Sequence, residues 1–80
     1  MDFTEEGYRL VGGLSDRAKK IALYLCCFGV RRIRTELWRE ADLIDRELVF
    51  RGLVEKKQYG PTPWYRVRER LFREVYRKGD

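Results

Sequence analysis

Apolar residues recur at helical spacing between Ser15 and Gly29. One face of a helix over this range carries Ala18, Ile21, Ala22, Leu25 and Phe28. Ser15 can cap the N-terminus of this helix, and Gly29 is a natural C-terminal stop. Leu23 and Cys27 lie one turn apart on the other side, where a lone surface helix is polar. The helix is therefore expected to be central to its own fold or to be shared with a second copy.

Residues 33–51 continue the helical spacing without a glycine or proline break. The apolar positions in this range are Ile33, Leu37, Ala41, Ile44 and Leu48. We interpret the stretch as two helices, 34–40 and 42–51, with the turn near Ala41 and Asp42. One helix over 33–51 fits the periodicity nearly as well. Residues 30–33 before it fit either a short strand or the start of that helix.

The pattern changes after Gly52, which ends the helical stretch. Residues 53–59 and 64–67 are predicted strands, and 60–63 join them as a hairpin loop of about four residues. Residues 68–78 are predicted to form a C-terminal helix with two apolar lines, Leu71–Val75 and Phe72–Tyr76. Residues 1–14 are expected to be partly loose or a short strand, at 8–11. Residues 15–80 then form the single domain.

Three segments around the predicted hairpin carry a family resemblance. They are residues 46–57 (Arg-Glu-Leu-Val-Phe-Arg-Gly-Leu-Val-Glu-Lys-Lys), 59–61 (Tyr-Gly-Pro) and 64–67 (Trp-Tyr-Arg-Val). Over about residues 15–67 the chain resembles the winged helix-turn-helix family, whose recognition helix typically leads through Gly-Leu-Val into a turn and a return strand. The resemblance implies a mainly α fold with a small β-hairpin (α+β), that is, a three-helix core, a two-stranded wing and the C-terminal helix. The predicted core contains Ile21, Leu25, Ile33 or Leu37, Ile44, Leu48, Leu53 and Val67.

The net charge of +5 is spread in blocks. Residues 17–34 carry six positive charges and no negative one, and residues 51–80 carry nine positive and four negative. Residues 35–50, between them, carry two positive and five negative charges. Basic blocks are the electrostatic footprint of a polyanion partner, although a solvated surface rich in Arg and Glu gives a similar composition. With the resemblance, they predict a small transcriptional regulator that binds double-stranded DNA, with or without sequence specificity.

The candidate DNA contacts are arginines and lysines on the predicted helices and wing. Phosphate contacts are expected from Arg31, Arg32 and Arg34, and from Lys56 and Lys57 in the wing. The recognition side is expected to use Arg39, Arg46 and Arg51, with Arg46 as the base contact, and Arg66 is placed to contact the minor groove or a phosphate. Asp42, Asp45 and Glu47 lie in the same helix and oppose phosphate binding.

Two other binding functions stay open. Because of these acids, the domain could instead be a winged-helix protein-interaction module of a transcription or replication assembly. RNA binding is a third hypothesis, with Tyr59, Trp64 and Tyr65 as stacking platforms.

The composition gives little support for an enzyme or for a cofactor-binding protein. The chain has no histidine to act as a general base, and its two cysteines, Cys26 and Cys27, are adjacent, which is not metal-site spacing. We therefore predict no enzyme activity, no cofactor, no metal and no small-molecule ligand. At least one cysteine is expected to pack as a reduced thiol, which suits a cytoplasmic protein, with an intersubunit disulfide as the alternative. The longest apolar run, 21–30, is too short for a membrane span.

The helix between Ser15 and Gly29 and the C-terminal helix 68–78 both carry more apolar residues than one small core can cover. This surplus predicts a homodimer. A two-fold axis between these helices would bury both surpluses at once, because such an interface uses the same patch twice. The expected interface consists of Leu23, Tyr24, Cys27, Leu71, Phe72, Val75 and Tyr76. The alternative is that the N-terminal segment folds back and covers the second face of the first helix within one chain.

Overall fold

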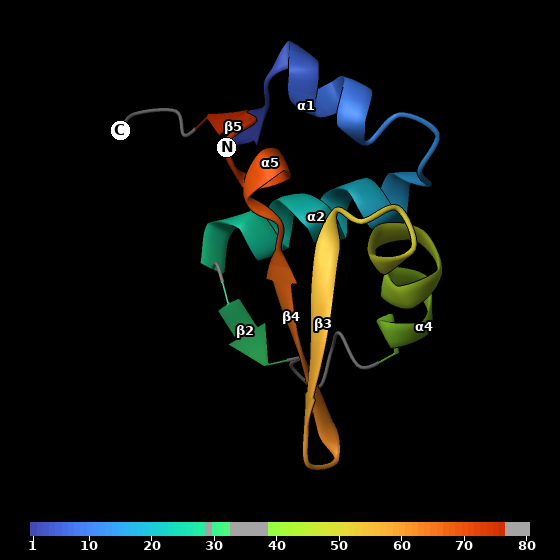
Figure 1. Cartoon of the computed structure of the whole chain (residues 1–80). Helices are drawn as coiled ribbons and strands as arrows, with labels where there is room; N and C mark the ends of the chain where they lie inside the picture. Colours follow the sequence, from blue (N-terminus) through green and yellow to red (C-terminus); the bar gives the residue numbers. More distant parts are fainter. Residues whose placement is uncertain (29, 33–38, 77–80) are drawn as a thin grey trace.

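The computed structural model describes residues 1–28, 30–32 and 39–76, which form a small α+β fold. Four helices and two small antiparallel sheets lie within these residues (Figure 1). The helices are α1 (Glu5–Leu10), α2 (Asp16–Phe28), α4 (Ala41–Leu43), which runs directly into the π-helix η1 (Ile44–Val49), and α5 (Glu69–Phe72). The strands are β1 (Asp2–Phe3), β2 (Val30–Arg32), β3 (Val54–Tyr59), β4 (Thr62–Val67) and β5 (Val75–Tyr76).

Helix α2 forms where its sequence predicts. The hydroxyl oxygen of Ser15 accepts a hydrogen bond from the N–H of Ala18 at 3.2 Å, which is the expected N-cap contact. Ala18, Ile21, Ala22 and Leu25 of the core line are buried as expected, and Cys26 is buried beside them. Cys26 and Cys27 are both free thiols, the second of them exposed. The prediction that at least one cysteine packs as a small apolar residue is therefore confirmed.

One hydrophobic core joins α2, η1 and the larger sheet. The expected core residues that the structure describes are all buried, namely Ile21, Leu25, Ile44, Leu48, Leu53 and Val67. Ile33 and Leu37 lie outside the described residues. Phe3, Val11 and Leu71 also belong to this core, so both ends of the chain contribute to it.

The helix before the hairpin is shorter than predicted, and most of it is a π-helix rather than an α-helix. Residues 39 and 40 form a turn, so a continuous helix over 33–51 is wrong, and the turn precedes Ala41. The predicted helix 34–40 lies mostly outside the described residues. Backbone hydrogen bonds at η1 span five residues, since the N–H of Phe50 donates to the carbonyl of Asp45 at 3.2 Å. Gly52, at φ +72°, then turns the chain into β3.

The hairpin of β3 and β4 is tighter than predicted, and a third strand joins it. Tyr59 pairs with Thr62, so the loop contains only Gly60 and Pro61 rather than four residues. Gly60 has φ +62°, and a proline at the second loop position excludes a type I′ turn, so the turn is type II′. Residues 30–32 form strand β2 on the other edge of β4, which gives the sheet order β2-β4-β3. The expected two-stranded wing is therefore part of a three-stranded sheet.

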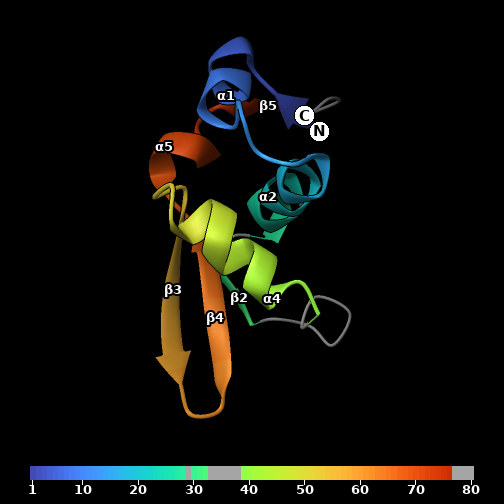
Figure 2. The same ribbon diagram turned by 90° about the vertical axis from the view of Figure 1, so that its right-hand side faces the viewer.

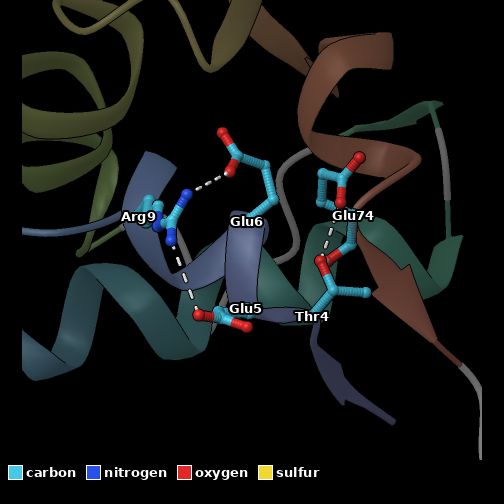
Figure 3. A pocket seen from close by; sticks show the side chains of 5 residues that line it. All are labelled: Thr4, Glu5, Glu6, Arg9 and Glu74. Atoms are coloured by element: carbon cyan, nitrogen blue, oxygen red, sulfur yellow. Dashed lines mark hydrogen bonds and ion pairs between the residues drawn. The ribbon is translucent and has the colours of Figure 1, made fainter.

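The two ends of the chain pair with each other, and two predictions there are wrong. Residues 8–11 are not a strand, because α1 covers 5–10, and the C-terminal helix 68–78 stops at Phe72. Strand β5 pairs with β1, so the chain after α5 is extended. Thr4 joins the two ends, because its hydroxyl donates to a Glu74 carboxylate oxygen at 2.7 Å (Figure 3). The pairing of β5 with β1 outweighs the helix propensity of this segment.

The elements are arranged around α2. In Figures 1 and 2 the pair β1–β5 and helix α1 lie above α2, and the hairpin extends downward beyond α4. Helices α2 and η1 pack on one face of the larger sheet. The hairpin tip therefore extends past the start of α4, at the end of the molecule opposite α1.

Candidate nucleic-acid interface

Asp45 points from η1 to the hairpin rather than to solvent. Its carboxylate accepts the hydroxyl proton of Tyr65 at 2.8 Å, and the ammonium of Lys56 lies 2.9 Å from its other oxygen. Lys56 also lies over the Tyr65 ring, 5.8 Å from the centroid. Burial, followed by the hydrogen bond to Asp45, raises the pKa of the Tyr65 hydroxyl. This acid fixes the angle between helix and hairpin.

Glu47 points from η1 to the start of α2. One carboxylate oxygen accepts from the N–H of Ser15 at 2.8 Å and the other from its hydroxyl at 2.9 Å. The backbone hydrogen bond, and then the hydroxyl one, holds the pKa of the Glu47 carboxyl below its ordinary value. Because Ser15 is also the N-cap of α2, this contact joins two helices at their ends.

The remaining acids of this region are paired as well. Glu40 forms an ion pair with Arg17 of α2 at 3.1 Å. Asp42 forms one with Arg46 a turn later, at 2.8 Å, and these two side chains are 80% and 66% exposed. Every carboxylate between residues 39 and 50 thus has a partner within the chain. Among the described acids, Asp45 and Glu47 join η1 to its neighbours, and Asp42 is 80% exposed at the surface.

Two of the exposed candidate cations bind groups within the chain. Arg51 donates to the carbonyl oxygens of Gly12 and Leu10, at 2.9 and 3.1 Å, where helix α1 ends with unsatisfied acceptors. Lys56 is held by Asp45, as described above. Arg51 and Lys56 thus have structural contacts, and both are exposed, so their expected DNA contacts stay predictions.

Four candidate cations stay at the surface. Arg39, Arg46, Lys57 and Arg66 are exposed. Within the part of the chain that the structure describes, Arg39, Lys57 and Arg66 make no ion pair. The backbones of Arg31 and Arg32 form β2, and Arg34 lies outside the described residues.

The face of the sheet opposite α2 and η1 carries cations around a tryptophan. We define the outer sheet face as Glu55, Lys57, Trp64 and Arg66, which share one side because Lys57 pairs with Trp64 and Glu55 with Arg66. Trp64 is half-buried, and Lys57 and Arg66 are exposed. Tyr65 alternates to the other face and is fully buried, so its predicted role as a stacking platform is wrong. The side chain of Tyr59 lies outside what the structure describes.

Phe50 is a large apolar side chain at the surface next to η1. It directly follows η1, and it is 85% exposed, more than any other large apolar side chain among the described residues. Phe50 does not lie on the helix face that carries the buried residues Ile44 and Leu48. A single exposed apolar side chain is common at protein surfaces, and at this exposure Phe50 is accessible to a partner.

One of the residues expected in a dimer interface is not accessible to a partner. Leu71 is fully buried inside the chain, whereas Phe72 and Tyr76 are exposed and lie on different elements. Phe3, Tyr8 and Leu23 line one shallow pocket of about 260 Å³ between the N-terminal segment and α2. The second face of α2 is thus covered in part by the chain itself, which was the alternative to a dimer. The homodimer stays a prediction, and its packing argument is weaker.

A second shallow pocket of about 280 Å³ is lined by Thr4, Glu5, Glu6, Arg9 and Glu74 (Figure 3). Arg9 bridges Glu5 and Glu6 there, so its charge offsets one of the two negative charges. Among the described residues no three potential ligands come together around a metal position. Within the same residues no helix has the length and apolar character needed to cross a bilayer.

No model of a known protein family matches the chain, and searches of curated proteins and of solved structures give no significant match. The functional argument therefore rests on the geometry described above.

Proposed function

We propose that this chain is a winged helix-turn-helix domain that binds double-stranded DNA, as a small transcriptional regulator would. The helix of α4 and η1 is the recognition helix in this proposal, and the β3–β4 hairpin is the wing. The observed succession of helix, short strand, helix and hairpin supports it. The hairpin also extends beyond the start of α4, so both elements can contact one duplex from the same end of the domain (Figure 2).

The observation that carries the proposal is that two acids of the recognition helix bind partners within the chain. Asp45 is bound to Lys56 and Tyr65, and Glu47 to Ser15, so both carboxylates are held toward the hairpin and α2. The outward side keeps Arg46 and the turn before it keeps Arg39, while Lys57 adds a cation on the wing. Neutralising phosphates with such cations releases counterions and drives binding.

Two neighbouring substitutions with opposite expected effects test this proposal. Arg46→Ala removes a cation from the outward side, and Asp42→Ala removes the only acid there and leaves Arg46 unpaired. In fluorescence anisotropy with a labelled random duplex, the first variant should bind more weakly than the native protein and the second more tightly. Equal affinities for all three proteins would contradict binding through this helix.

Phe50 favours a second function, a protein-interaction module. An aromatic side chain this exposed is typical of an anchor that inserts into a pocket of a partner. If this function is the right one, Phe50→Ser abolishes binding to that partner and leaves stability unchanged, and native protein shows no salt-sensitive binding to duplex DNA.

A further inference from the structure

Arg46 meets Asp42 through the inner nitrogen of its guanidinium group. The N–H at Nε donates to Oδ2 of Asp42 at 2.8 Å. Neither terminal nitrogen of Arg46 has a hydrogen-bond or ion-pair partner among the residues that the structure describes. The side chains of Arg46 and Asp42 are 66% and 80% exposed, so the pair lies at the surface. Asp42 therefore holds one edge of the guanidinium group, and the fork of its two terminal nitrogens stays available to a ligand.

The pair lies near the start of the recognition helix, on a face that the fold does not cover. Asp42 is in the first turn of α4 and Arg46 follows one turn later in η1, so the two side chains share a face of the helix. The buried residues of this helix, Ile44 and Leu48, lie on another face. The hairpin extends beyond the start of α4 (Figure 2). A duplex held by the recognition helix and the wing therefore comes within reach of the Arg46 fork.

An acid beside a DNA-binding cation needs a role that offsets its cost in affinity. Asp42 repels phosphates and so lowers the affinity for any duplex. Its exposed pair with Arg46 also contributes little to the stability of the fold. What Asp42 provides is a fixed orientation, because restricting the arginine before binding lowers the entropy that complex formation loses. A fixed fork of donors matches the acceptors O6 and N7 of guanine, whereas adenine presents an amino group in place of O6.

We propose that Asp42 positions Arg46 to read guanine in the major groove of the duplex. The two terminal nitrogens of Arg46 donate to O6 and N7 of one guanine, while Nε keeps its hydrogen bond to Asp42. Arg46 is then the specificity-determining residue, and Asp42 is a positioning residue that acts through it. This inference rests on the proposed function and deepens it, because it makes a duplex with guanine at one position of its site the preferred ligand.

The test begins with selection of bound duplexes from a random pool by the native protein, which should give sites that share one guanine. Fluorescence anisotropy then compares a selected duplex with versions that differ only at this base pair. Replacing the G·C pair by A·T should weaken binding of the native protein by about tenfold or more. Replacing the guanine by 7-deazaguanine, which lacks the N7 acceptor, should also weaken binding, because Arg46 loses one of its two acceptors.

Substitutions then separate the positioning of Arg46 from its charge. Arg46→Lys keeps the charge without the fork, so it should bind a random duplex much as the native protein does and lose the preference for guanine. Asp42→Ala should bind the random duplex more tightly and yet lose most of this preference. Asp42→Asn keeps an oxygen acceptor for Nε and should retain more of the preference than Asp42→Ala. Glu69→Ala makes the same change of charge on α5 and should leave the preference intact.

The outcomes separate this inference from the proposed function. Duplex binding without a preferred guanine overturns the inference and leaves the proposed function standing, and so does a preference that Arg46→Lys or Asp42→Ala retains in full. An affinity that 7-deazaguanine leaves unchanged also overturns the inference, because the fork then has no contact with N7. Absence of binding of the native protein to any duplex removes both the inference and the proposed function.

Discussion

Asp45 and Asp42 lie three residues apart on one helix, and the structure predicts very different losses of stability when each is replaced by alanine. Asp45→Ala leaves the hydroxyl of buried Tyr65 without its acceptor and Lys56 without its ion pair. An unsatisfied buried polar group costs about 1–3 kcal/mol. Asp42→Ala breaks an exposed pair with Arg46 whose contribution is about 0.3–0.5 kcal/mol.

Urea unfolding followed by circular dichroism measures both changes at neutral pH. The free energy of unfolding should fall by about 1–3 kcal/mol for Asp45→Ala and by less than about 0.5 kcal/mol for Asp42→Ala. The two variants share the substitution and the helix, so differences in helix propensity cancel. Equal losses, or the larger loss at Asp42, would refute the assignment of Asp45 as the contact that joins helix and hairpin.

Three further predictions concern the pH dependence of stability, the close approach of the chain ends and the two thiols. The pKa of Glu47 is depressed in the folded protein, so its stabilising contribution is present above the ordinary value of 4.5 and is lost as the pH falls below it. Urea unfolding between pH 7 and pH 3 should therefore show a steeper loss below about pH 4.5 for the native protein than for Glu47→Gln, and parallel curves would contradict the contact. Gly7→Ala should destabilise the fold, because its new Cβ would lie 2.5 Å from the carbonyl oxygen of Glu74, and overpacking costs about 1–3 kcal/mol against about 1 kcal/mol gained from helix propensity. Under native conditions a thiol reagent should modify exposed Cys27 rapidly and buried Cys26 only after unfolding, and equal rates would place Cys26 outside the core.

Sequence periodicity found the parts of the fold that depend on local pattern. Helix α2 and the hairpin are confirmed because their signals are local, in the cap at Ser15 and the turn at Gly60. The tail was mispredicted because residues 68–78 have helical spacing, and the pairing of β5 with β1 joins residues more than 70 positions apart. No local sequence pattern predicts pairing between strands so far apart in the chain.

The candidate site shows the same limit. Charge blocks select the arginines and lysines as candidate contacts, but the sequence could not distinguish Lys56 from Lys57, which point to opposite faces of one strand. The sequence alone predicts that Asp45 and Glu47 oppose DNA binding. It does not reveal their partners, Tyr65 and Ser15, because these lie 20 and 32 residues away. Alternation in β3 and β4 was the one signal that could have separated the outer sheet face from the core in advance.

The salt dependence of duplex binding tests the central claim most directly. Native protein is titrated against a random duplex at several salt concentrations, and the logarithm of the association constant is plotted against that of the salt concentration. Binding through phosphate contacts predicts a linear fall, and Arg46→Ala should reduce the slope by about 1 if this side chain contacts a phosphate. An affinity that does not change with salt, or no binding at low salt, would contradict the account.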